Sequence, residues 1–215
     1  MKQRIRIRFS KAGPLRWISH HDLMRLWERM LRRSGLSIAY SEGFNPRPRM
    51  SFPLALGLGI ESADEVIEID LARWMSAAAV ERALADQAPS GLSIKDLELL
   101  PPNEKGQVER VEYEVALRPG EPAEVAGRLA RLLESGTMPV VRQRNQKTID
   151  LAPYVTAARV EGDVLRFAFR VTGEGTARPE EFCGLLGLEL GQVPVRVRKT
   201  ATRMAPVSAP ASAPV

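Results

Sequence analysis

Two stretches in the first 71 residues alternate between apolar and charged side chains, the first throughout and the second from Ile67 onward, and this pattern restricts the fold most strongly. They are RIRIRF at residues 4–9 and EVIEIDL at residues 65–71. Successive side chains of a β-strand point to opposite faces of its sheet, so both stretches predict strands with one buried and one charged face. Arg4, Arg6 and Arg8 share the charged face of the first strand and repel one another unless an anionic group lies nearby. Carboxylates of the strand at 65–71 and phosphates of RNA would serve equally well.

A helix is predicted between these strands, over residues 19–34. Ser19 and Asp22 form an S-x-x-D capping signature at its start, and Gly35 is typical of the position just after a helix end. Most of the arginines of this segment, Arg25 among them, fall off the apolar stripe. The apolar residues that recur at helical spacing, and therefore predict a buried stripe, are Leu23, Leu26, Trp27, Met30 and Leu31.

The order of the predicted elements indicates an α+β fold. In the first half it is β-α-β-β-α-β, the order of the ferredoxin-like split βαβ unit. The elements of this half are strands at 4–9, 37–41, 64–71 and 92–99 and helices at 19–34 and 76–87, with an extended piece at 50–52.

A similar order restarts after a Pro-rich linker near residues 101–106. We therefore predict two tandem ferredoxin-like (βαββαβ) units, at residues 1–100 and 107–204, and a disordered, low-complexity tail at 205–215. The elements of the second half are strands at 108–117, 155–160, 164–171 and 193–199, helices at 121–134 and 179–186, and an extended basic segment at 139–150.

Composition limits the class of protein. The chain has 215 residues, a net charge of +5 and one cysteine, Cys183. A single cysteine excludes a disulfide framework or a cysteine-ligated metal within the chain. The amino terminus reads as a strand instead of a signal peptide, and no apolar run approaches the length of a membrane span. We expect a soluble, cytoplasmic protein that does not contact a membrane.

The positive charge is concentrated near the amino terminus. Residues 1–50 contain 12 Lys or Arg and 3 Asp or Glu, whereas residues 51–100 contain 3 and 9. A focused basic field suits a phosphate-bearing partner, although a solvated face explains a charge run as well.

The loop SEGFNPRPR at residues 41–49 is stiffened by its two prolines. Arg47 and Arg49 can grip phosphate, and the amide of Asn45 can either read a base edge or complete a turn. Phe44 and Tyr40 suit base stacking or the core. The predicted nucleic-acid-binding residues are Arg4, Arg6, Arg8, Arg25, Asn45, Arg47 and Arg49.

His20 is the one candidate catalytic residue. At a helix amino terminus a histidine is favoured in its neutral form, which suits a general base, but a side chain that hydrogen-bonds to the loop and positions it explains the residue better. The sequence contains no C-x-x-C set, P-loop, G-x-G-x-x-G fingerprint or H-E-x-x-H motif. No self-contained catalytic motif is therefore present, and no cofactor is expected in this chain.

Residues 5–71 resemble the amino-terminal signature of the radical-SAM-linked protein family, a bacterial domain of unknown function. The matching segments are RIRFSKAGPLRWISHHDLMRLWERMLRRSGL, AYSEGFNPRPRMSFPLALGLGIES and EVIEIDL. Members are encoded beside, or fused to, a radical SAM protein, so the resemblance implies such a partner. S-adenosylmethionine and an iron–sulfur cluster would then reside on that partner. His21 and Arg47 depart from the residues common in the family, which weakens a catalytic role for either.

Three functions remain open at this point. The first is an accessory protein of a radical SAM enzyme that binds RNA, or a ribosome-related substrate, and presents it for modification. The second is a metal-independent ribonuclease with His20 as general base. The third is a protein-docking module whose basic face meets an acidic surface of the radical SAM protein.

Overall fold

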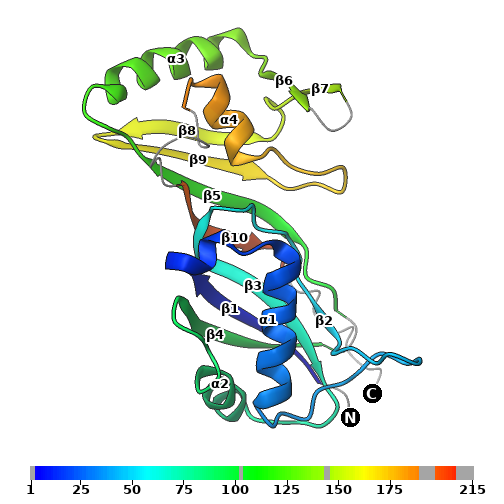
Figure 1. The fold of residues 1–215 in the computed structure, drawn as a ribbon. Helices are drawn as coiled ribbons and strands as arrows, with labels where there is room; N and C mark the ends of the chain where they lie inside the picture. Colours follow the sequence, from blue (N-terminus) through cyan, green and yellow to red (C-terminus); the bar gives the residue numbers. More distant parts are fainter. Residues whose placement is uncertain (1–2, 102–103, 143–145, 189–196, 207–215) are drawn as a thin grey trace, which may run out of the picture. The chain divides into compact units, whose positions relative to one another are not determined.

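A computed structural model of the chain describes residues 3–101, 104–142, 146–188 and 197–206. The chain divides into two compact units, which we call unit 1 (Met1–Val108 and Met204–Val215) and unit 2 (Glu109–Arg203). Within the described residues, four α-helices combine with β-sheets to give a mixed α and β structure (Figure 1). None of the described helices is long and apolar enough to cross a membrane.

Unit 1 is built on an antiparallel sheet. Its strand order is β4-β1-β3, and β2 pairs with the outer side of β3. The elements are β1 (Gln3–Lys11), a 3-10 helix (Gly13–Trp17), α1 (His20–Arg33), β2 (Met50–Ser51), β3 (Glu61–Leu71), α2 (Ala77–Ala85) and β4 (Leu92–Leu100).

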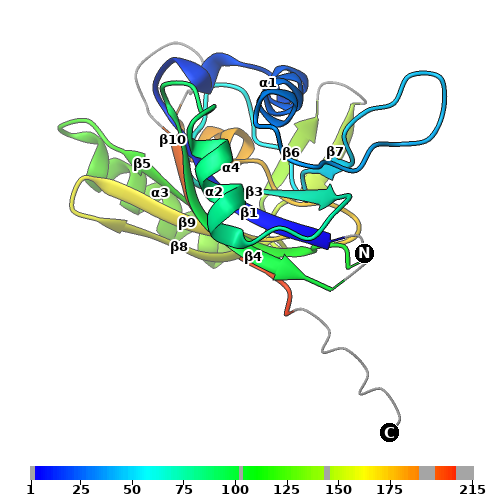
Figure 2. The ribbon, with the colours of Figure 1, turned by 90° about the horizontal axis from the view of Figure 1, so that it is seen from below.

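The two alternating stretches form β1 and β3, as predicted, and they pair directly, with Ile5 opposite Ile69 and Ile7 opposite Ile67. Both α1 and α2 pack on the apolar face of this sheet, where Trp27 and Val80 join the isoleucines in one buried core (Figure 2). The other face of the sheet carries the charged residues.

Helix α1 begins where the capping signature predicts. The Ser19 hydroxyl accepts a hydrogen bond from the backbone N–H of Asp22 at 3.1 Å. The predicted stripe is confirmed, because Leu23, Trp27 and Met30 are buried, along with Leu31, while Leu26 is partly buried against the same core.

The predicted strand at 37–41 is wrong. The segment makes only isolated bridges, from Ile38 to Leu71 and from Tyr40 to Pro48. It lies between the end of β3 and the returning arm of the 41–49 loop. It forms one bridge with each of these neighbours, so no continuous ladder forms.

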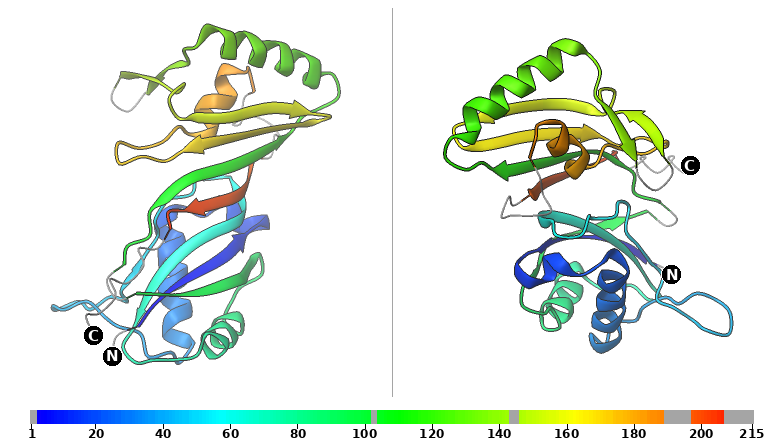
Figure 3. Two further views of the ribbon diagram at one scale, coloured as in Figure 1. Left: turned by 180° about the vertical axis from the view of Figure 1, so that it is seen from behind. Right: turned by 45° about the horizontal axis from the view of Figure 1, so that its top comes forward.

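Unit 2 contains the strands β10-β5-β9-β8, in this order within an eight-stranded sheet, and a separate two-stranded sheet of β6 and β7. Helix α3 runs along strands β8 and β9 (Figure 3). The elements are β5 (Val108–Ala116), α3 (Glu121–Ser135), β6 (Pro139–Arg142), β7 (Lys147–Asp150), β8 (Val155–Glu161), β9 (Val164–Arg170), α4 (Pro179–Leu185) and β10 (Val197–Met204).

Aromatic side chains form the centre of the unit 2 core. Phe167 and Phe169 lie on one face of β9, and the ring of Phe182 on α4 packs against them with centroid distances of 4.9 and 5.7 Å. Tyr113 of β5 stacks on Phe167 at 5.5 Å. Helix α4 is therefore held to the sheet by one aromatic cluster.

The second half departs from a simple βαββαβ order. Within the segment predicted as extended at 139–150, residues 139–142 and 147–150 form the paired strands β6 and β7, which stay off the main sheet because their residues are exposed or half-buried and bring no buried face to it. Residues 193–196 of the predicted last strand, and residues 207–215 of the predicted disordered tail, lie outside the described residues.

Candidate functional site

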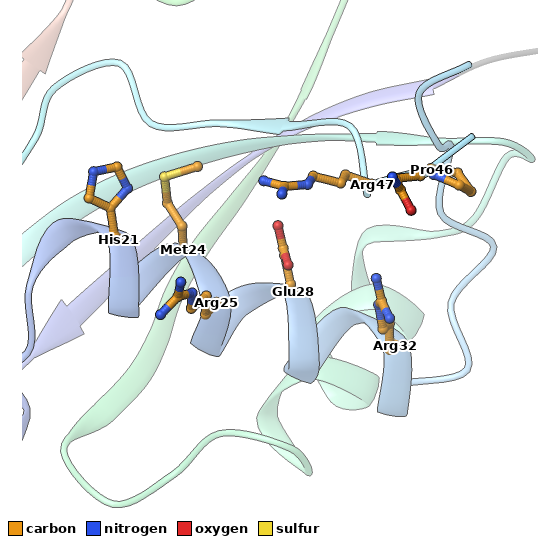
Figure 4. A pocket seen from close by; sticks show the side chains of 8 residues that line it. His21, Met24, Arg25, Glu28, Arg32, Pro46 and Arg47 are labelled. Carbon is orange, nitrogen blue, oxygen red and sulfur yellow. The ribbon is translucent and has the colours of Figure 1, made fainter. Parts of the chain in front are cut away.

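A groove of about 510 Å³ lies in unit 1 between α1 and the 41–49 loop. We call it the α1–loop groove. Five lining residues project from the helix and three from the loop (Figure 4). From α1 they are His21, Met24, Arg25, Glu28 and Arg32, and from the loop Asn45, Pro46 and Arg47.

The helical side of the groove follows from helix geometry. His21, Arg25, Glu28 and Arg32 are spaced at i, i+4, i+7 and i+11, which places them in one row along the helix. The row lies off the buried stripe of α1 and turns toward the loop. Of these four residues only Arg25 is predicted from the sequence to bind a ligand, although the helical spacing places the other three on the same row.

The loop side is held by backbone hydrogen bonds. Ser41 N–H donates to the Arg47 carbonyl at 2.9 Å, and Arg47 N–H donates to the Ser41 hydroxyl at 3.0 Å. Arg49 N–H donates to the Ala39 carbonyl at 2.8 Å. The chain reverses between these arms at Gly43, whose φ of +119° disfavours a side chain. Hydrogen bonds therefore join the two arms of the loop, and its tip is exposed.

Of the three arginines that line the groove, only Arg25 has a protein partner among the described residues. Arg25 makes an exposed ion pair with Asp22 at 3.5 Å. Within the described part of the chain, the guanidinium groups of Arg29, Arg32, Arg47 and Arg49 make neither a hydrogen bond nor an ion pair. The groove thus contains guanidinium groups that no carboxylate of the described residues neutralises and that can bind an anionic ligand.

Arg4, Arg6 and Arg8 lie elsewhere, on the sheet face opposite α1, and each pairs with a carboxylate of the protein. Their ion-pair partners are Asp70 at 2.7 Å and Glu68 at 2.9 Å for Arg4, Glu68 and Glu98 at 3.0 Å each for Arg6, and Asp64 at 2.8 Å for Arg8. Of the two anionic partners that the sequence allows, the structure shows the carboxylates.

Glu68 is the centre of this charged face. Its buried carboxylate accepts hydrogen bonds from Arg4, from Arg6 and from the backbone N–H of Gly106 at 3.1 Å. A side chain at position 106 would overlap that carboxylate. The three predicted arginines here are thus structural groups of the sheet, and the structure does not bring them to the α1–loop groove.

His20 also lies outside the groove. Its ring packs edge-on against Phe52 at 5.3 Å, and its Nδ1 is buried without a hydrogen-bond partner among the described residues. Burial lowers its pKa, and the charges of His21 and Lys11 lower it further, while Glu65 opposes them. These causes favour the neutral form of His20, whose buried Nδ1 faces the interior, and His20 is not among the residues that line the α1–loop groove.

This environment predicts a pH dependence of stability. The free energy of unfolding should fall as the pH drops below about 6.5, the ordinary pKa of histidine, because the unfolded chain then binds a proton that folded His20 resists. Denaturant titrations at a series of pH values should show this fall in the wild type and a flatter profile in His20→Gln. The comparison variant His21→Gln, at an exposed neighbour, should keep most of the fall, since burial is the largest cause of the shift. An unchanged profile in His20→Gln would contradict the assignment.

The remaining side chains that could act as nucleophiles or metal ligands do not form a site. Burial raises the pKa of the Cys183 thiol to about 12, so this cysteine is a core residue and no nucleophile. In the part of the chain that the structure describes, no cluster of three or more His, Cys, Asp or Glu side chains suits a metal ion. The α1–loop groove therefore remains the best candidate for a ligand site.

Comparison with known proteins supplies a family. A family model described as "Uncharacterized protein conserved in bacteria (DUF2344)" matches residues 4–179. That description names no reaction, ligand or partner, so the link to a radical SAM protein stays a prediction. No curated protein matches the chain. A crystal structure of an unknown protein from Galdieria sulphuraria aligns over 79% of this chain and 81% of its own at 12% identity, with a TM-score of 0.29 that establishes no common fold.

Proposed function

We propose that this chain, which belongs to the DUF2344 family of uncharacterized proteins conserved in bacteria, is an RNA-binding accessory protein of a radical SAM enzyme. In this proposal the α1–loop groove holds RNA, or an RNA-containing ribosomal substrate, and presents it to the enzyme in the cytoplasm. S-adenosylmethionine and the iron–sulfur cluster belong to the partner. The partner therefore performs the chemistry, and the present chain supplies binding.

One observation carries the RNA part of the proposal. Arg32 lines the helical side of the groove and Arg47 the loop side, and among the described residues neither guanidinium has a protein partner, whereas the arginines of β1 are neutralised by carboxylates. Guanidinium groups that are left unpaired around a groove can bind phosphate oxygens in bidentate fashion. Arg25 and Arg32 are seven residues apart, about 10 Å along the helix axis, which suits a polymer of phosphates better than a single phosphate group.

The radical SAM part has a different basis. It rests on the resemblance of residues 5–71 to the radical-SAM-linked family, and no contact in the structure bears on it. A related proposal concerns the fold. Each unit has its main strands in the spatial order fourth, first, third, second, which is the order of a ferredoxin-like unit if the β6–β7 hairpin is an insertion in the second.

The RNA proposal is tested by removing the groove cations. In the triple variant Arg25→Gln, Arg32→Gln and Arg47→Gln, affinity for a short labelled RNA should fall on the order of a thousandfold at low salt, since each charged hydrogen bond contributes about 1.5 kcal/mol. The slope of log K against log salt should also become shallower by about 2, because each lost phosphate contact removes about 0.7. Fluorescence anisotropy over a salt series measures both quantities.

A matched control separates the groove from net charge. The variant Arg118→Gln, Arg131→Gln and Arg170→Gln removes the same charge from exposed positions of unit 2. It should bind RNA like the wild type. Equal losses of RNA affinity in both variants would show that the effect comes from net charge and not from the groove. A wild-type protein without RNA affinity would overturn the proposal in favour of a docking module for an acidic protein surface.

A further inference from the structure

The tip of the 41–49 loop carries a fully exposed aromatic ring. Phe44 has a relative exposure of 105%, the largest among the exposed large hydrophobic residues in the described part of the chain. The ring is held there by the hydrogen bonds that join the two arms of the loop at Ser41 and Arg47 and by the bridge between Tyr40 and Pro48. The loop therefore holds a phenyl ring in water as a flat apolar surface that has no partner among the described residues of unit 1.

The groove beside Phe44 contains a carboxylate as well as cations. Glu28 lies between Arg25 and Arg32 on α1, and its side chain points toward Arg47 across the groove (Figure 4). Among the described residues its carboxylate makes no hydrogen bond and no ion pair. A carboxylate accepts hydrogen bonds and repels phosphate, so a site for phosphates alone gains nothing from it. Its natural complement is a ligand with hydrogen-bond donors next to its phosphates.

We propose that the α1–loop groove selects single-stranded RNA, with an unpaired base stacked on Phe44 and a donor of that nucleotide bonded to Glu28. This inference rests on the proposed RNA-binding function and names its substrate class. An unpaired nucleotide combines phosphates for the arginines, a flat face for the phenyl ring and donors on its Watson–Crick edge or ribose 2′-hydroxyl. A duplex offers none of its base faces and keeps its Watson–Crick edges paired, so it matches the arginines alone.

The test compares one RNA sequence as a single strand and as a duplex. Phe44→Ala should weaken binding of the single strand about 5- to 150-fold, which corresponds to the loss of one stacked base, and should leave duplex binding unchanged. Phe44→Trp should retain single-strand binding. The salt slope should be the same in Phe44→Ala as in the wild type, because no phosphate contact is removed. Thermal melting of each variant confirms that the exposed position does not affect folding.

Glu28→Gln distinguishes the role of the carboxylate. If Glu28 accepts a hydrogen bond from the nucleotide, the variant should lose affinity for the single strand, while its affinity for the duplex should stay the same or rise, because the carboxylate no longer repels phosphate. Comparison with single-stranded DNA of the same sequence then separates the 2′-hydroxyl from the base edge, since only a 2′-hydroxyl contact makes wild-type binding favour RNA over DNA. A gain of affinity for every nucleic acid would show that Glu28 merely repels phosphate and would overturn its assigned role.

Failure of this inference is distinguishable from failure of the RNA proposal. If the triple arginine variant loses RNA while Phe44→Ala keeps the wild-type preference between single strand and duplex, the arginine groove stands and single-strand selection falls. If the wild type binds neither form of RNA, both proposals fall together. If it binds the duplex more tightly than the single strand, the assignment of Phe44 is wrong.

Discussion

Replacing Glu68 with glutamine is expected to lower the free energy of unfolding of the chain by about 3–5 kcal/mol. Glu68 is 1% exposed and accepts hydrogen bonds from two arginines and one backbone N–H. Arg6, at 3% exposed, is nearly as deeply buried. A neutral amide in place of the carboxylate leaves the buried Arg6 guanidinium without its main counter-charge, and removing one member of a buried ion pair is strongly destabilising.

The chain offers a matched control for this substitution. Glu98 bonds the same arginine at 3.0 Å, but its side chain is 49% exposed. Glu98→Gln should therefore cost less than about 1 kcal/mol, because solvent screens an exposed ion pair. Denaturant unfolding followed by circular dichroism measures both values. Similar losses in the two variants would show that the burial of Glu68 does not govern the strength of the interaction.

Replacing Phe182 with alanine is expected to cost a similar amount, about 3–5 kcal/mol, within unit 2. The ring is fully buried and contacts Phe167 and Phe169, so its removal leaves a cavity between α4 and β9. Because α4 is only seven residues long, it has little stability of its own and depends on this contact. We expect α4 to be the element that loosens first.

The same substitution at an exposed site provides the control. Phe44→Ala removes an identical ring from the loop tip, where it contacts water, and should change the free energy of unfolding by less than about 0.5 kcal/mol. Thermal unfolding gives the difference, and amide hydrogen exchange shows whether protection is lost in α4 and β9 of Phe182→Ala. A small loss at Phe182 would mean that the surrounding aromatic rings close the cavity.

Periodicity in the sequence was sufficient to place β1, β3 and α1. Alternation at 4–9 and 65–71 and the 3.6-residue stripe from Leu23 to Leu31 are local signals of which side chains face a core. The capping signature at Ser19 was equally local and equally accurate. The strand predicted at 37–41 failed because a ladder depends on the neighbours that a segment meets in space, and its neighbours here each accept one bridge.

The candidate site also combines features that the sequence predicted with features that only the structure revealed. From the sequence, the basic segment, the stiff loop, Arg25, Asn45 and Arg47 could all be named, and the structure brings these three residues together in one groove. The sequence left open whether the arginines of β1 face carboxylates or RNA. Only the register of the sheet, which sets Arg6 opposite both Glu68 and Glu98, decided for the carboxylates.

The sequence by itself thus determined the faces of the elements, the concentration of positive charge and the stiff, basic character of the 41–49 loop, while the exposure of Phe44 came from the structure. The tertiary structure alone decided which arginines are neutralised by carboxylates and which are not. It also decided that His20 turns inward and that Glu28 lies beside the arginines opposite the loop. The physical reason is that periodicity reports whether a side chain is buried, whereas charge pairing depends on residues distant in sequence, such as Arg6 and Glu68, that meet only when the chain folds.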